Sequence, residues 1–218
     1  MMSDRRDEMN RNQQEDQSRE RILRAAEEEF LEKGFEKASL RNISRNAGVT
    51  TGSLYWHFQN KEELFEALTG EHYRFLMNMY RDAQQKFFEM SPKEQMEHIG
   101  EAGDDGMEVM IEYIYQHKTG FKLLTDCAAG TRYENMIHEL TEAEIASTHR
   151  FTENIKELGA GVDRIRPELE HILVSGMLTS MFELVIHDVP LEIARECARD
   201  IHAFYTAGWK YLVNLPKQ

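Results

Sequence analysis

Apolar residues recur at intervals of three and four along most of the chain, which is the period of amphipathic α-helices. With Ser, Thr, Gly and Pro at the ends of its segments, this pattern predicts nine helices, at about 17–33, 39–47, 50–58, 61–90, 92–102, 105–118, 119–158, 167–187 and 190–213. The seventh is expected to be interrupted near Ala129-Gly130, because glycine weakens a helix by about 1 kcal/mol relative to alanine. No strand-like alternation follows Pro92. The expected fold class is all-α.

Residues 39–64 carry the most specific local pattern, two short helices joined by a tight turn. Ser39 is a natural N-cap for the first helix, and Gly48 can end it in the left-handed conformation. Thr50 or Thr51 can cap the second helix. This arrangement is a helix-turn-helix. The residues expected to face inward are Leu40, Ile43, Ala47, Val49, Leu54, Tyr55 and Phe58.

The outward face of the second helix has the composition of a nucleic-acid contact surface. Gly52, Ser53 and Trp56 share one side of it, where glycine permits close approach and the other two can donate hydrogen bonds or stack. Between Lys37 and Lys61 the chain contains basic residues and neither Asp nor Glu. In a chain of net charge −13, this segment is the expected electrostatic footprint for DNA.

The sequence Gly-Val-Thr-Thr-Gly-Ser-Leu-Tyr-Trp-His-Phe at 48–58, followed by Lys-Glu-Glu-Leu at 61–64, resembles the DNA-binding signature of the TetR family of bacterial transcriptional regulators. The resemblance covers roughly residues 17–70. It implies an N-terminal three-helix DNA-binding domain at 17–62 and a C-terminal helical effector-binding and dimerisation domain at 63–218. Within the second domain, the resemblance implies that residues 63–90 form a helix connecting the two.

The resemblance also implies roles for individual residues, and the chemistry of their side chains agrees with it. Arg41 is expected to contact a base edge or a phosphate. Tyr55 is expected to bind a phosphate, and the alternative is a core residue whose hydroxyl is exposed to solvent. The full expected DNA-binding set is Arg41, Thr50, Thr51, Gly52, Ser53, Tyr55, Trp56, His57 and Lys61.

Residues 1–16 are polar, charged and without periodicity, which predicts a disordered arm or a frayed helical extension. Arg5, Arg6 and Arg11 could reach a minor groove, although acidic residues are interleaved with them.

Two C-terminal stripes of apolar residues, within 167–187 and 190–213, follow helical spacing almost without a break. In the resembled family the equivalent helices pair with those of a second subunit to form a four-helix interface. The alternative is that both stripes face the protein's own core. The expected homodimer interface comprises Leu169, Ile172, Leu173, Gly176, Met177, Ser180, Leu184, Ile201, Phe204, Tyr205, Gly208 and Trp209.

The chain contains 12 Met residues, and many of them fall on helices expected to line the interior. Together with aromatic residues they suit an adaptable apolar pocket for a small-molecule effector, with ordinary core packing as the alternative for each residue. The expected pocket residues are Met107, Met110, Tyr113, Phe121, Cys127, Tyr133, Met136, Phe151, Met177, Met181 and Phe182.

Composition limits the function classes. The chain has 218 residues, of which 41% are hydrophobic and 30% charged, as in soluble globular proteins. No apolar signal-peptide core occurs near the N-terminus, so a cytoplasmic location without membrane partners is expected. Residues 1–61 carry equal numbers of basic and acidic side chains. The whole net charge therefore lies downstream, and only the N-terminal part is expected to face DNA.

Other functional classes have weaker support. Glu134, His138 and Glu142 share a helix face and could ligate a metal, as could His149 with Glu153, but such residues equally form exposed helix pairs, and no metal or other cofactor is expected. A redox sensor would use Cys127 or Cys197. The sequence contains no H-E-x-x-H, G-x-S-x-G or phosphate-binding glycine loop, so we do not expect an enzyme.

The combined expectation is a ligand-responsive transcriptional regulator, acting as a repressor. It would bind a palindromic DNA operator as a homodimer and be released by a small, largely apolar or aromatic inducer.

Overall fold

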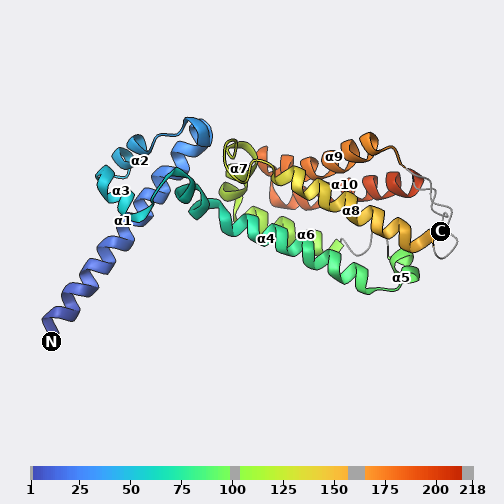
Figure 1. Cartoon of the computed structure of the whole chain (residues 1–218), viewed down its shortest axis with the longest axis horizontal. Helices are drawn as coiled ribbons and strands as arrows, with labels where there is room; N and C mark the ends of the chain where they lie inside the picture. The colour runs from blue at the N-terminus through green and yellow to red at the C-terminus, as the bar shows by residue number, and fades with distance from the viewer. Residues whose placement is uncertain (1, 99–103, 157–164, 213–218) are drawn as a thin grey trace. The chain divides into compact units, whose positions relative to one another are not determined.

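The computed structural model describes residues 2–98, 104–156 and 165–212, and within them it contains ten helices and no strand (Figure 1). The prediction of an all-α fold is confirmed. The helices are α1 (Met2–Lys37), α2 (Leu40–Asn46), α3 (Thr51–His57), α4 (Lys61–Glu89), α5 (Pro92–Glu97), α6 (Asp104–Gln116), α7 (Lys118–Asp126), α8 (Met136–Lys156), α9 (Pro167–Ile186) and α10 (Leu191–Leu212).

The tenth helix arises because the segment predicted as one interrupted helix from 119 to 158 forms two, α7 and α8. Between them, Gly130 adopts a φ of 82° and its N–H donates to the Glu134 carboxylate at 2.9 Å. The Thr131 hydroxyl donates to the Ala128 carbonyl at 2.7 Å. A hydrogen-bonded turn therefore separates the helices, which is a larger interruption than one weak glycine. The predicted helix ends near 102, 158 and 213 lie outside the described residues.

The start of the chain is helical from Met2, which is the second of the two alternatives for the N-terminal arm. Gly34 has non-helical torsion angles inside α1, with φ 71° and ψ 166°. The straight part of the helix therefore ends at the predicted glycine, and the chain turns there toward α2.

Contacts group residues 1–73 with 119–134 in one compact unit. Its core contains Phe30, Phe35 and Phe65, whose ring centroids are 5.2–5.9 Å apart. Segment 119–134 joins this unit through Tyr133, which is 3% exposed, and through the Phe35 N–H, which donates to the Cys127 carbonyl at 2.9 Å. The sequence-based boundary at 62/63 did not include this segment with the N-terminal helices and stays a prediction.

The second unit contains residues 74–118 and 135–218, and its helices α8, α9 and α10 pack against one another in sequence. A buried cluster between α6, α9 and α10 contains Ile111, Met181, Leu184, Ala194 and Ala198. The Tyr115 hydroxyl reaches the carbonyls of Leu184 and Val189, at 3.1 and 2.7 Å. This tyrosine thereby holds the turn between α9 and α10 against α6.

Helix α9 is apolar around most of its circumference. Among the described residues it is the one helix long and apolar enough to cross a membrane by composition alone, and a third of that stretch is buried inside the protein. A helix of this kind needs apolar neighbours on several sides. One side has them within this unit, since Val174, Phe182 and Val185 are buried.

Candidate nucleic-acid interface and internal pocket

The turn between α2 and α3 is built by local hydrogen bonds that the sequence predicts. The Ser39 hydroxyl accepts from the Asn42 N–H at 3.4 Å, and the Thr50 hydroxyl accepts from the Ser53 N–H at 3.0 Å, so each helix has its N-cap. Gly48 adopts a φ of 64°. Its N–H donates to Arg45 O, and the next N–H donates to Ser44 O at 3.0 Å. This pair of bonds is a Schellman motif, which requires a left-handed residue where Gly48 stands.

The buried carboxylate of Glu29 connects α1 to the start of α2. Its side chain is 3% exposed, and Oε1 accepts from Lys33 Nζ at 3.0 Å, from the Ser39 N–H at 3.1 Å and from Asn42 Nδ2 at 3.3 Å. Burial raises the pKa of Glu29, but these hydrogen bonds outweigh it and hold the pKa below its ordinary value. The charge also lies at the N-terminus of α2, where the helix dipole favours it.

Lys61 at the start of α4 holds the other side of the motif. Its Nζ donates to the carbonyls of Glu36 and Ala38 at 3.0 and 3.2 Å, and it lies 4.5 Å from the ring centroid of Phe35. The ammonium group therefore satisfies two carbonyls at the end of α1. Of its three donors, one is left for a phosphate.

Helix α3 has one buried and one exposed face. Leu54 is fully buried and Phe58 is 2% exposed, whereas Tyr55 is 51% and Trp56 65% exposed. The prediction that Tyr55 faces inward is wrong: it lies one position after Leu54, about 100° around the helix, and so turns away from the core. Thr50, Thr51 and Gly52 are exposed as well.

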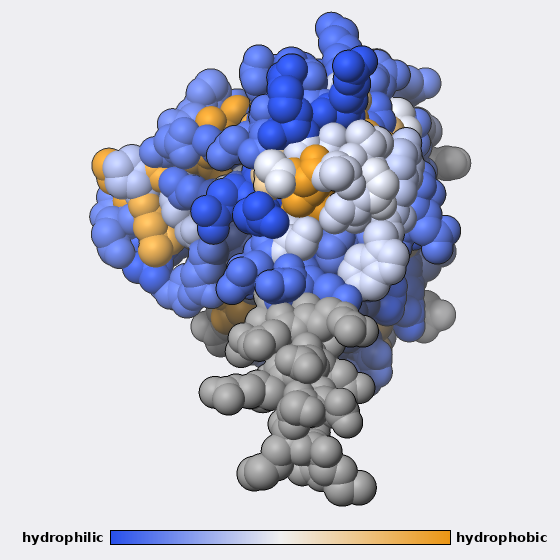
Figure 2. Space-filling view, turned by 90° about the vertical axis from the view of Figure 1, so that its left-hand side faces the viewer, coloured by the Kyte–Doolittle hydropathy of each residue, from blue (hydrophilic) through white to orange (hydrophobic). Residues whose placement is uncertain are grey.

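The surface around α3 is hydrophilic, with a pale patch of intermediate hydropathy in the view of Figure 2. Arg41 and Arg45 are exposed on α2. Arg19 of α1 was not predicted from sequence, yet its guanidinium lies 5.4 Å from the ring centroid of Phe58 at the end of α3. Burial and the nearby Arg19 charge lower the pKa of His57. The imidazole is therefore a neutral hydrogen-bonding group near pH 7 and Arg19 the cation beside it.

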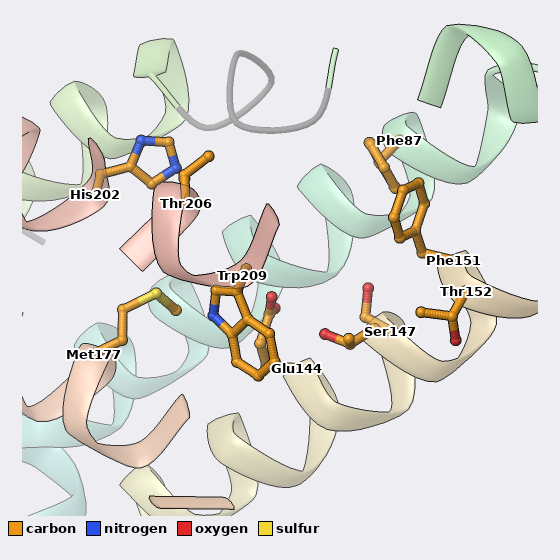
Figure 3. A pocket seen from close by; sticks show the side chains of 10 residues that line it. Phe87, Glu144, Ser147, Phe151, Thr152, Met177, His202, Thr206 and Trp209 are labelled. Carbon is orange, nitrogen blue, oxygen red and sulfur yellow. The ribbon is translucent and has the colours of Figure 1, made fainter. Parts of the chain in front are cut away.

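The second unit contains a cavity of about 200 Å³ between α4, α8, α9 and α10. Figure 3 shows side chains from these helices around it. The lining residues are Phe87, Glu144, Ser147, Thr148, Phe151, Thr152, Met177, His202, Thr206 and Trp209. Two of them, Phe151 and Met177, belong to the predicted pocket.

Glu144 is the acidic group of this cavity. Its carboxylate accepts hydrogen bonds from the Tyr80 hydroxyl and from Gln84 Nε2, the latter at 3.1 Å. Burial raises the pKa of Glu144, while the Tyr80 hydrogen bond and His202 act in the opposite direction. Burial and the neighbouring carboxylate raise the pKa of Tyr80, so Tyr80 remains a donor. The cavity therefore combines aromatic walls with one deep acceptor.

The other predicted pocket residues do not line this cavity. Phe121, Cys127 and Tyr133 are buried in the first unit, and Met136, Met181 and Phe182 are buried in the second. Tyr113 stacks on Phe75 with ring centroids 3.5 Å apart; Met107 packs against the cluster around Ile111, and Met110 is half-buried. Burial raises the pKa of the Cys127 thiol, which disfavours the reactive thiolate that a redox sensor needs.

The residues of the predicted dimer interface differ in burial. Leu184 is buried in the protein's own core, and a Cβ on Gly176 would lie 3.0 Å from the Tyr205 hydroxyl, so Gly176 serves the packing of α9 on α10. By contrast, Ile172 is 65% and Phe204 74% exposed. The half-buried members are Leu169, Leu173, Met177, Ser180, Ile201, Tyr205 and Trp209, and Gly208 is exposed.

Comparison with known proteins identifies the N-terminal part. Residues 22–68 match the model of the bacterial regulatory proteins of the tetR family. This part of the chain is a DNA-binding domain of the TetR-family type. The transcriptional regulator TtgR of Pseudomonas putida is 46% identical over 52 residues, which are 24% of this chain and 25% of TtgR. The repressor BepR of Brucella suis is 44% identical over 54 residues, 25% of this chain and 26% of BepR.

These alignments cover about a quarter of each TetR-family relative, so they concern the DNA-binding region. Over the longer chain, a transcriptional regulator from Aquifex aeolicus has a TM-score of 0.51 at 22% identity, covering 84% of this chain and 96% of that one. The SmeT–triclosan complex has a TM-score of 0.53 at 17% identity, covering 88% and 90%. At these identities the likeness shows the TetR-like fold. The relatives are named as regulators, in agreement with the prediction that the chain is not an enzyme.

Replacing Glu29 by glutamine tests the connection between α1 and α2. We expect Glu29→Gln to lower the unfolding free energy by about 1.5–3 kcal/mol at neutral pH, the range for hydrogen bonds to a charged group. Because the folded pKa lies below the ordinary 4.5, the wild-type advantage is present above that value and is lost as the pH falls through the folded pKa. Urea unfolding at about pH 7 and about pH 3 measures both effects.

Glu32→Gln is the matched control, since Glu32 is exposed on the same helix. Equal losses for Glu29→Gln and Glu32→Gln, or a loss independent of pH, would contradict the role assigned to Glu29.

Proposed function

We propose that this protein is a cytoplasmic transcriptional repressor that binds a palindromic DNA operator as a homodimer and responds to a small-molecule effector. The observation that supports DNA binding best is the exposed face of α3 in a segment without acidic residues. Trp56 is 65% and Tyr55 51% exposed, although aromatic side chains of this size are usually well buried. The TetR-family match covers the same segment.

In this proposal α3 enters the major groove. Gly52 permits close approach of the backbone, and Thr51, Ser53 and Trp56 contact bases or the sugar-phosphate chain. Arg41 and Arg19 supply the charge for phosphates. Further hydrogen bonds to the DNA come from the neutral side chains of Tyr55 and His57 and from the remaining cationic donor of Lys61. Lys61 is a poor test residue, because its substitution would also remove two hydrogen bonds to α1.

Trp56→Ala and Arg41→Ala test this interface with less risk to the fold, because both side chains are exposed. We expect Trp56→Ala to weaken binding to the upstream DNA of the gene by about 1–3 kcal/mol, and Arg41→Ala to reduce the slope of log affinity against log salt by about 1 if it contacts a phosphate. Fluorescence anisotropy over a salt series measures both.

The control is Lys93→Ala, which removes an exposed cation of the second unit and should leave affinity unchanged. Wild-type protein without affinity for that DNA at low salt, or unchanged affinity in both test variants, would exclude this interface.

The dimer proposal rests on the apolar side chains that α9 and α10 expose. Ile172 and Phe204 are mostly exposed although their helices also contribute to the buried core. Gly208 would have open space around a Cβ, so a neighbouring helix could approach it closely. When two such surfaces pair about a two-fold axis, every contact occurs twice, once in each subunit. The same symmetry places two recognition helices about 34 Å apart, on successive major grooves.

We expect Phe204→Glu and Ile172→Glu to convert the dimer to a monomer. Each substitution places a charge at two symmetric positions, and loss of about 2 kcal/mol of apolar burial at each weakens association about 100-fold or more. Light scattering after size exclusion distinguishes the 25.6 kDa chain from its dimer.

Arg199→Glu is the control, because Arg199 is exposed on α10 about 140° around the helix from Phe204. A wild-type monomer, or variants that remain dimeric, would contradict the dimer proposal.

The effector proposal rests on the cavity around Glu144. Its walls include Phe87, Phe151 and Trp209, while the half-buried Glu144 carboxylate is an acceptor to which a bound molecule can donate a further hydrogen bond. At about 200 Å³ the cavity is smaller than the roughly 300 Å³ of common ligand sites. We therefore propose a small aromatic effector with one hydrogen-bond donor directed at Glu144.

Trp209 provides a direct readout, since the chain has 2 Trp and Trp56→Phe leaves Trp209 as the single tryptophan, while operator affinity is measured with the wild type. We expect small aromatic phenols, beginning with triclosan, to quench Trp209 and to lower operator affinity. Their methyl ethers, which lack the donor, should bind about 2- to 10-fold more weakly, since one hydrogen bond contributes about 0.5–1.5 kcal/mol. Equal binding of phenols and ethers, or quenching without any change in operator affinity, would contradict this proposal.

A further inference from the structure

Three possible metal ligands gather where α8 packs against α9. His138 and Glu142 are one helical turn apart on α8, and His171 lies on α9. Their ligand atoms are all within 4.8 Å of one another. His171 Nδ1 is 3.5 Å from Glu142 Oε1, and the ring centroids of the two histidines are 5.8 Å apart.

These distances suit a tetrahedral cation site. With bonds of about 2.0–2.1 Å, neighbouring ligand atoms around Zn²⁺ lie about 3.4 Å apart. The contact between His171 and Glu142 already has this length. The widest separation must shorten by at most roughly 1.4 Å, which a rotamer adjustment can supply, because His138 and Glu142 are exposed side chains.

The composition of the cluster distinguishes it from an ordinary His–Glu ion pair. Elsewhere in the second unit such pairs have one histidine for one carboxylate and shorter contacts, 2.8 Å for His149 with Glu170 and 2.9 Å for His187 with Glu183. Here two imidazoles share one carboxylate. Two imidazoles and one carboxylate are a ligand set that a divalent cation binds together.

The structure also corrects the sequence-based ligand set. Glu134 was considered with His138 and Glu142, but its carboxylate accepts from the Gly130 N–H in the turn before α8. The third ligand comes instead from His171, 29 positions after Glu142. Residues so far apart in sequence have no spacing signature.

We propose that His138, Glu142 and His171 form a binding site for Zn²⁺ or a similar first-row divalent cation, with a water molecule in the fourth position. The cation ties α8 to α9 and stabilises the folded second unit by mass action. It also fixes the backbone next to Ile172, the exposed residue adjoining His171. This proposal depends on neither DNA binding nor the effector.

The test uses the full chain after treatment with EDTA. We expect Zn²⁺, titrated against a chromophoric chelator, to bind with one ion per chain and to raise the unfolding temperature. His138→Ala and His171→Ala should each weaken Zn²⁺ binding by about 100-fold or more, since each removes a direct ligand. Circular dichroism verifies that the variants are folded.

His149→Ala is the matched control. It removes a histidine from the same pair of helices whose partner is Glu170, and it should retain the wild-type affinity for Zn²⁺. Absence of stoichiometric binding in wild type, or unchanged binding in a His138→Ala/His171→Ala double variant, overturns the proposal. Both measurements are made without DNA, so their outcome is distinguishable from failure of the proposed repressor function.

Discussion

The geometry of the DNA-binding unit depends on one buried carboxylate. Glu29 lies on α1 and accepts hydrogen bonds from Lys33 on its own helix and from the Ser39 N–H and Asn42 at the start of α2. An uncompensated charge in this place would be costly. With three donors and the helix dipole beside it, the carboxylate instead fixes where α2 begins. Since α3 follows after a four-residue turn, the direction of the recognition helix follows from this point.

The turns after α2 and after α9 have the same backbone conformation and hydrogen-bond pattern. After α2, Gly48 is left-handed and the N–H of the next residue returns to Ser44. After α9, Asp188 has a φ of 52° and the Val189 N–H returns to Leu184. Glycine adopts this conformation without strain, whereas aspartate does so at some cost. At the second turn, tertiary contacts hold this conformation, because Lys118 pairs with Asp188 at 3.6 Å and the Tyr115 hydroxyl donates to the Leu184 and Val189 carbonyls.

The sequence predicts what short-range chemistry decides. Ser39, Gly48 and Thr50 make their bonds within five residues, so the helix-turn-helix follows from local pattern alone. The role of Glu29 could not be predicted in this way. In the sequence it is one more acidic residue of a solvated helix, and its partners on α2 are 10 and 13 positions away. For the same reason, the predicted pocket shares only Phe151 and Met177 with the cavity. Methionine flexibility does not locate a pocket, because the cavity wall depends on how four helices meet.

The polar residues of α8 lie on two sides of the helix, and each side belongs to a different site. With 100° between successive residues, Glu144, Ser147 and Thr148 fall on one side of the helix, where they line the cavity. His138 and Glu142 fall about 120–160° away from Glu144 around the helix, against α9. Helix α9 also contributes to both sites, because His171 belongs to the proposed cation site and Met177 lines the cavity. A cation that fixes α8 against α9 therefore also fixes two walls of the cavity. The proposed metal and effector sites are thus coupled through the packing of one helix pair, and each ligand should alter the affinity for the other.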